Sequence, residues 1–126
     1  MSKPVIWIPR TLSNATLERA RRDYEVIWNA TDTPGSAEDI IRMSASVDGI
    51  IPCHSEHFSA DVVAQLDPRL KIVANHSVGV DHCDLDALRG KGIVVTNTPD
   101  VLSDATAELA MMLMLGAARN AVAGDR

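Results

Sequence analysis

Short apolar runs alternate with helix-like stretches five times along this chain, and this alternation limits the possible fold more than any other feature. The runs occupy 5–8, 26–28, 47–51, 70–74 and 93–96. The first, Val5-Ile6-Trp7-Ile8, is continuous rather than alternating in polarity, as is typical of a strand that is covered on both faces. We therefore expect five buried strands with helices between them.

The stretches between these runs carry helix signals. Residues that can cap a helix stand at 13–14, 36 and 59. A fourth, short helix over 85–89 is followed by glycines at 90 and 92, which suit the left-handed conformation after a helix. Strand–helix repeats of this length imply a parallel sheet with helices on both faces. We predict an α/β fold with a flavodoxin-like, doubly wound parallel five-stranded sheet.

One long helix is expected to follow, from Val101 to about Asn120. Its apolar positions, which include Leu102, Leu109 and Met112, cover nearly all of its sides. A helix of this kind must be buried nearly all round. The five-stranded unit has no obvious room for it, so the helix needs a partner surface, either a second domain or a second subunit.

Charge and composition argue against several partners. The net charge is −5, whereas nucleic acid or an anionic membrane would need a clustered basic face. The run 5–8 is too short for a secretory signal, and the run 109–118 falls short of the ~18 residues that indicate a membrane span. Cys53 and Cys83 form neither a disulfide framework nor a C-x-x-C pair. We predict a cytoplasmic protein with no nucleic-acid or membrane partner.

The loop after the fourth run, 75–81, is the first candidate site, because open α/β sheets bind ligands at the carboxyl ends of their strands. Gly79 has no Cβ, so a ligand can approach its backbone closely, and it can adopt unusual backbone angles. Successive free N–H groups in the loop could hold a carboxylate. A plain tight turn is the alternative interpretation.

The start of the long helix is the second candidate site. Ser103 can act as the N-cap with Asp104 in the first turn, and Thr106 lies just inside the helix. Helix starts present unpaired N–H groups and a positive dipole end, which suit anions. The Thr106 hydroxyl could add a bond to a phosphate or ribose, although a threonine at this position is more often an ordinary helix-start residue.

The histidines offer further possibilities. His54 follows the third strand and could line a substrate pocket, as could His76, which stands next to the candidate carboxylate-binding residues Ser77, Val78 and Gly79. Histidine and cysteine spacings match no standard zinc pattern, so no metal site is predicted. A nucleophile pair of Cys53 and His54 is not expected, since adjacent side chains point apart and no third group orients the base.

Three motifs in order carry a resemblance to a known family. They are Val78-Gly79-Val80-Asp81, Thr96-Asn97-Thr98-Pro99 and Thr106-Ala107-Glu108-Leu109. Together they resemble the D-isomer-specific 2-hydroxyacid dehydrogenase family, which includes glyoxylate and hydroxypyruvate reductases. The close match covers about 70–120, and residues 1–69 agree mainly in the order of strands and helices.

The resemblance implies roles for named residues. In the family, the loop corresponding to 75–81 binds the substrate carboxylate through backbone amides. Val78 and Gly79 fall on the matching positions, with Ser77 as a neighbouring candidate. Thr106 matches a residue that touches the bound nicotinamide dinucleotide, and Leu102 matches an apolar residue that lines it. The implied reaction is hydride transfer between NAD or NADP and a small 2-oxo or 2-hydroxy acid.

The resemblance also implies that part of the family's machinery is absent. No G-x-G-x-x-G follows a strand before Arg126, and the family's catalytic Arg, Glu and His have no counterparts here. The implied parts are a substrate-binding lobe (1–98), an interdomain helix (99–120) and a truncated linker (121–126). Such a chain is expected to be catalytically silent alone. Its helix would meet the missing Rossmann domain or a second subunit of a homodimer. A non-catalytic binding or dimerisation module derived from the lobe is the alternative.

Overall fold

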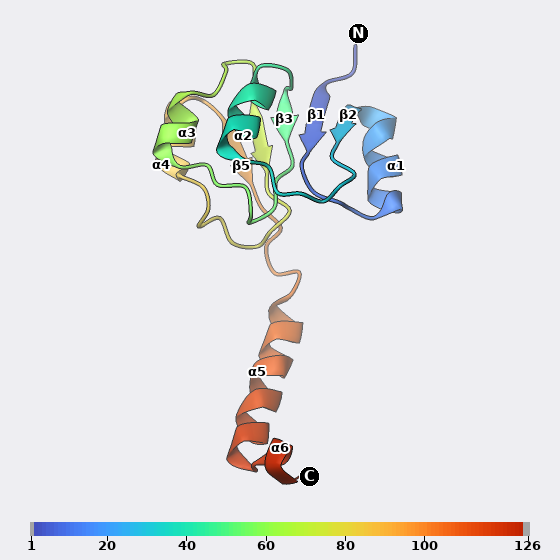
Figure 1. The fold of residues 1–126 in the computed structure, drawn as a ribbon, viewed down its shortest axis with the longest axis vertical. Helices are drawn as coiled ribbons and strands as arrows, with labels where there is room; N and C mark the ends of the chain where they lie inside the picture. The colour runs from blue at the N-terminus through green and yellow to red at the C-terminus, as the bar shows by residue number, and fades with distance from the viewer. Residues whose placement is uncertain (1, 125–126) are drawn as a thin grey trace.

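Five short parallel strands form the sheet of this computed structural model, which describes residues 2–124 (Figure 1). The strands are β1 (Val5–Ile8), β2 (Glu25–Trp28), β3 (Gly49–Ile50), β4 (Ile72–Ala74) and β5 (Val94–Thr96). They lie in the order β2-β1-β3-β4-β5, and every neighbouring pair is parallel. The predicted flavodoxin-like sheet is therefore confirmed.

Serine side chains start three of the helices, as the sequence predicts. The helices are α1 (Asn14–Asp23), α2 (Ala37–Ser44), α3 (Ala60–Ala64), α4 (Leu85–Gly90), α5 (Ser103–Ala118) and α6 (Ala121–Gly124). The hydroxyls of Ser13, Ser36 and Ser59 each accept a backbone N–H from the first turn of α1, α2 and α3. Of the two glycines at the end of α4, Gly92 takes a positive φ, of 73°. Gly90 is the last helical residue instead, so its predicted left-handed conformation is wrong.

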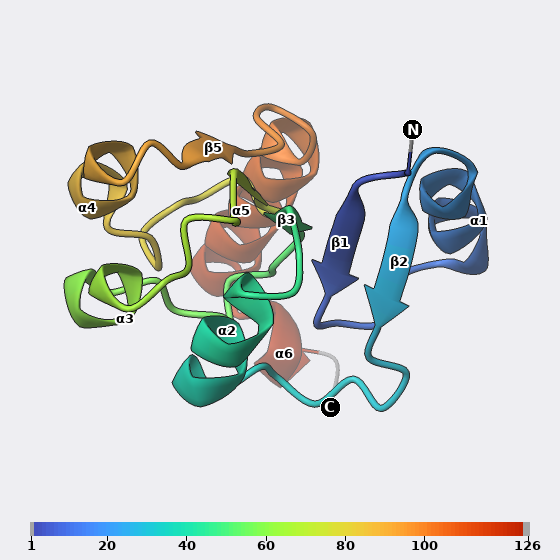
Figure 2. The ribbon, with the colours of Figure 1, turned by 90° about the horizontal axis from the view of Figure 1, so that it is seen from above.

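The two faces of the sheet differ in how well they are covered. Trp7, Ile50, Val73 and Val95 lie side by side on the face that carries α2, α3 and α4, and the first three are buried. Figure 2 shows these helices grouped on the side away from α1. This face holds the larger of two hydrophobic clusters, and it fixes the loops at the carboxyl ends of β3 and β4.

The opposite face is covered only over β1 and β2. There α1 packs Leu17 against Ile6 and Ile8. On this face, burial decreases from β1 toward β5 among residues that lie side by side in the sheet. Ile6 is buried, Ile72 is half-buried, and Val94 is 56% exposed. Helices therefore lie on both faces, but β4 and β5 present apolar side chains to solvent on this one.

The helix α5 projects away from the sheet (Figure 1) and buries none of its residues. Apolar side chains are exposed on every side of it, from Leu109 at 51% to Leu115 at 62%. The helix ends where Asn120 takes a positive φ of 49°, as is common just after a helix, and α6 follows. The stretch 121–126 thus begins as a short helix, and its last two positions lie outside the described residues. No helix within residues 2–124 is long and apolar enough to cross a membrane.

Candidate functional site

A cleft of about 540 Å³ lies where the loops after β3 and β4 meet the start of α5. It brings together five residues predicted for ligand binding: Ser77, Val78, Gly79, His54 and Leu102. The remaining lining residues are His57, His76, Asp81 and His82. Thr106, the sixth predicted residue, is exposed on α5 and is not among those that line the cleft.

The loop 75–81 is tied down through its carbonyl groups. Thr98 N donates to Ser77 O at 3.0 Å, Asn97 Nδ2 donates to Val78 O at 2.8 Å, and Ser77 Oγ donates to Gly79 O at 2.8 Å. Within the described part of the chain, no protein acceptor takes the N–H groups of Val78 and Gly79. The loop therefore presents two adjacent free donors at the cleft, an arrangement that suits an anion.

Gly79 leaves these donors accessible. A Cβ at this position would meet only Asp81 Oδ2, at 3.2 Å. The backbone of Gly79 does not use a positive φ, since Gly92 alone does so among the described glycines. The unusual backbone angles considered for Gly79 are therefore not adopted, and what this glycine provides is the absence of a side chain.

A buried carboxylate holds the other rim of the cleft. Glu56 is fully buried, and its oxygens accept Gly35 N at 3.1 Å, Cys53 N at 2.8 Å and Ser55 Oγ at 2.9 Å. Arg10 Nη1 donates to Ser55 Oγ at 2.6 Å. These bonds fix the turn after β3, so that His54 and His57 reach the cleft from a rigid backbone.

Asn75, the first residue of the loop 75–81, forms a buried polar pair with His82. His82 Nε2 lies 2.7 Å from Asn75 Oδ1, and Asn75 Nδ2 donates to Thr96 O at 3.1 Å. Because the amide nitrogen of Asn75 faces a carbonyl, its oxygen must be the acceptor, so His82 carries a proton on Nε2. The pair links the carboxyl end of β4 to β5.

Burial lowers the pKa of His82, and the nearby His57 and His54 lower it further. Asp81 and Glu56 act in the opposite direction. His82 is consequently held neutral as the hydrogen-bond donor to Asn75. Burial also raises the pKa of Cys83, which keeps that thiol protonated.

Cys53 and His54 lie closer together than the sequence reasoning allows. Cys53 Sγ is 3.4 Å from His54 Nδ1, so the expectation that these neighbours point apart is wrong. The thiol also lies 3.7 Å from His76 O, to which it can donate. No hydrogen bond within residues 2–124 orients the second ring nitrogen of His54, so the pair lacks the third group of a nucleophilic triad.

The residues described contain no group of three or more His, Cys, Asp or Glu side chains placed to hold a metal ion.

The start of α5 differs in detail from the prediction. Leu102, not Ser103, occupies the N-cap position, and no side chain caps the helix. Ser103 is the first helical residue because the first turn closes through Thr106 N and Leu102 O, at 3.0 Å. The first-turn N–H groups lack a side-chain cap and lie next to the cleft through Leu102.

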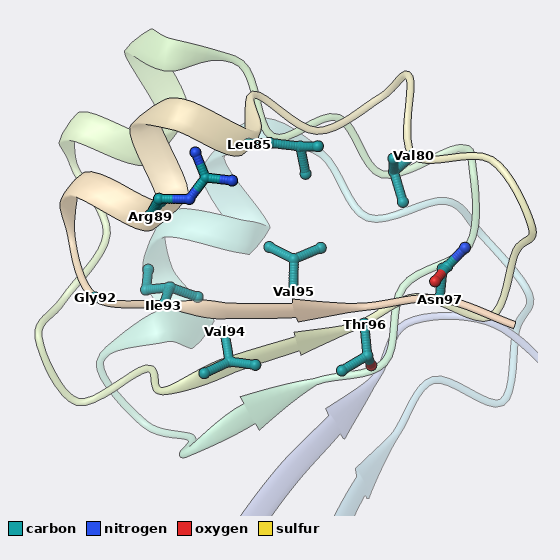
Figure 3. Close-up of a pocket in the computed structure, with 9 residues that line it drawn as sticks. All are labelled: Val80, Leu85, Arg89, Gly92, Ile93, Val94, Val95, Thr96 and Asn97. Atoms are coloured by element: carbon teal, nitrogen blue, oxygen red, sulfur yellow. The ribbon is translucent and has the colours of Figure 1, made fainter.

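A second hollow, of about 500 Å³, runs along the outer edge of the sheet at β5. Figure 3 shows Val95, Leu85 and Arg89 converging on one side of β5, while Val94 and Thr96 point to the other. Arg89 is its one charged lining residue. No residue predicted for ligand binding lines this hollow, and it lacks the convergent polar groups of a ligand site.

Sequence reasoning missed the residues that support the cleft from behind. Glu56, Asn75 and His82 are buried polar side chains, and only their positions just after β3 and β4 set them apart in the sequence. His57 also lines the cleft, and its position in the turn after β3 is its one signal in the sequence.

Comparison with known proteins agrees with these features. The family model "D-isomer specific 2-hydroxyacid dehydrogenase, catalytic domain" matches residues 6–123. A glycerate dehydrogenase of Hyphomicrobium methylovorum is 37% identical over all of this chain and 39% of its own length. A glyoxylate reductase of Pyrococcus horikoshii is 38% identical over 98% of this chain and 37% of its own length. The chain thus spans less than two-fifths of the length of these relatives.

Solved structures show the same likeness. A Polaromonas protein described as an NAD-binding D-isomer specific 2-hydroxyacid dehydrogenase superposes with a TM-score of 0.80 at 36% identity, covering 91% of this chain and 36% of that one. An NADPH-dependent glyoxylate/hydroxypyruvate reductase of Sinorhizobium meliloti, solved with NADP and malonate, gives 0.71 at 32% identity, covering 91% and 34%. With a family model that matches nearly the whole chain, this protein belongs to the D-isomer specific 2-hydroxyacid dehydrogenase family.

Proposed function

We propose that this chain is the substrate-holding part of an NAD(P)-dependent oxidoreductase that interconverts small 2-oxo acids and D-2-hydroxy acids. One observation carries the proposal: the adjacent free N–H groups of Val78 and Gly79 open into a cleft at the carboxyl edge of the sheet. A carboxylate bound there would accept two backbone hydrogen bonds, and charged acceptors make such bonds strong. The acid would thereby be fixed in the cleft that Leu102 also lines.

The cleft residues also fit one wall of a dinucleotide site. Leu102 is half exposed and borders the cleft, so it offers an apolar surface for a flat ring. The uncapped first turn of α5 offers N–H groups, and Thr106 adds a hydroxyl one turn further on. Bound there, NAD or NADP would supply the hydride. This chain's contribution is then to hold the acid, to shape one wall and to position the imidazoles of the cleft.

A dinucleotide needs further binding groups than this chain provides, so hydride transfer requires a second structural unit. The exposed apolar surface of α5 is where we place the contact with that unit. The same surface is the observation that favours the second candidate function, a non-catalytic module that associates through α5 as a homodimer.

The test joins this chain to the remaining part of the P. horikoshii glyoxylate reductase and follows NADH or NADPH oxidation with glyoxylate or hydroxypyruvate. The chimera should turn over, whereas the 126-residue chain alone should not. In the chimera, Gly79→Leu should lower kcat/KM about 100-fold by displacing the bound acid, while Gly90→Leu, at an open position away from the cleft, should not. A folded chimera without activity, or one indifferent to Gly79→Leu, would contradict the proposal.

A further inference from the structure

All four histidines of the chain border the one cleft that holds the Val78–Gly79 loop. His54 and His57 come from the turn after β3, His76 comes from the loop after β4, and all three are exposed. No lysine or arginine lines the cleft, and Asp81 is its one acidic residue. Three solvent-facing imidazoles in so small a space are more than one bound carboxylate requires.

The backbone segments that carry the imidazoles are held in place by hydrogen bonds. The Glu56 carboxylate fixes the turn that carries His54 and His57 through Cys53 N and Ser55 Oγ. His76 N donates to Pro52 O at 2.8 Å, which joins the second loop to the first. The cleft therefore combines the backbone N–H groups of Val78 and Gly79 with imidazoles that two joined loops carry.

We infer that the acid held in this cleft is a dicarboxylate: one carboxylate lies on the N–H groups of Val78 and Gly79, and the second lies among His54, His57 and His76. This inference rests on the proposed function and narrows its substrate class. Neutral imidazole can donate one hydrogen bond, and protonated imidazole donates from both nitrogens and adds a charge.

The other charged groups around the cleft are compatible with this assignment. Asp81 lies beside Gly79 and also lines a neighbouring hollow with His57 and His82. The Glu56 oxygens are already engaged by protein donors, and Arg10 pairs with Asp32 while it binds Ser55. His82 is buried and bonded to Asn75, so it does not reach the ligand directly.

The experiment is an NMR titration of the full 126-residue chain with glycolate, a monocarboxylate, and tartronate, the dicarboxylate with the same hydroxyl. Both acids should shift the Val78 and Gly79 amide signals. Only tartronate should also shift the ring signals of His54, His57 and His76. Tartronate should bind about tenfold or more tightly than glycolate at pH 6, as charged hydrogen bonds allow.

Variants separate charge at the cleft from charge elsewhere. The double variant His57→Gln/His76→Gln keeps hydrogen-bonding side chains but removes two imidazoles, so the tartronate advantage over glycolate at pH 6 should fall several-fold. Lys3→Gln removes a positive charge near α1, where Lys3 bonds Arg21 O, and should leave this advantage unchanged.

Two outcomes would overturn the inference, and they have different consequences for the proposed function. If glycolate shifts the Val78 and Gly79 amides but tartronate binds no better at pH 6, the dicarboxylate class is wrong and the proposed function stands. If neither acid shifts these amides, the carboxylate loop itself is wrong, and the inference falls with it.

Discussion

At the scale of single residues, two glycines of this chain have different roles, one in packing and one in ligand binding. A Cβ added at Gly49, inside β3, would lie 2.9 Å from Ile72 Cγ2 in the packed sheet. A Cβ added at Gly79 would meet only Asp81 Oδ2, at 3.2 Å. Gly49→Ala should therefore cost about 1–3 kcal/mol of unfolding free energy through overpacking, whereas Gly79→Ala should cost less than about 1 kcal/mol and weaken carboxylate binding. Urea denaturation and glycolate titration of both variants check this pair, and equal stability losses would contradict it.

The buried Glu56 side chain stabilises the fold through the hydrogen bonds that it accepts. Glu56→Ala would leave the half-buried N–H groups of Gly35 and Cys53 without this acceptor. We expect a loss of about 3 kcal/mol in unfolding free energy, since each unsatisfied donor costs about 1–3 kcal/mol. Glu18→Ala on the exposed side of α1 is the matched control and should change stability by less than about 0.5 kcal/mol. A loss at Glu56 no larger than at Glu18 would show that the buried network is not formed.

The lowered pKa of His82 makes stability depend on pH. Its native pKa lies below that of the unfolded chain, so the unfolded state binds more protons in the window from about pH 6.5 downward. Unfolding free energy should therefore fall as pH drops from 7.5 to 5. Aspartates with lowered pKa values, such as Asp39 and Asp48, lose their contribution only at more acid pH. Urea denaturation at several pH values checks this, and His82→Gln should flatten the slope; an unchanged slope would be inconsistent with a buried neutral His82.

At the scale of elements, local signals predicted what local interactions decide. Ser13, Ser36 and Ser59 form caps because a cap needs only a hydroxyl within one turn of its own helix. The predicted third strand over 47–51 shrinks to Gly49–Ile50, because strand length depends on how many residues pair with β1 and β4 on both sides. Ser103 fails as a cap for a similar reason: the chain enters α5 through Leu102, and sequence alone does not set that entry.

The helix α5 exposes a large apolar surface, and the sequence does not identify the surface that covers it. Its exposed apolar surface should make this chain self-associate, since large apolar patches rarely stay in water. Leu113→Lys places a charge in the middle of that surface and should shift the species seen in sedimentation velocity toward monomer. Ala15→Lys, on exposed α1, adds the same charge elsewhere and should leave the distribution unchanged. A strictly monomeric parent chain at all concentrations would contradict this expectation.

At the scale of the whole molecule, the sequence predicted the sheet and the loop but not the cleft. The period of the apolar runs and the motif around Gly79 are local in the chain, and both predict correctly where the loop lies. The cleft exists because the turn at His54 and the loop at His76 are joined across the sheet, through His76 N and Pro52 O. Contacts between residues so far apart in the chain leave no local pattern, so Glu56 and Asn75 became visible only in the fold.

The most direct test of this account is an amide NMR titration of the chain with glycolate. The account predicts that the largest shifts fall on Val78 and Gly79, that smaller ones fall on their cleft neighbours, and that Gly79→Leu abolishes them all. Shifts confined to the hollow along β5, or the absence of any saturable shift at Val78 and Gly79, would contradict the claim that this loop holds a carboxylate.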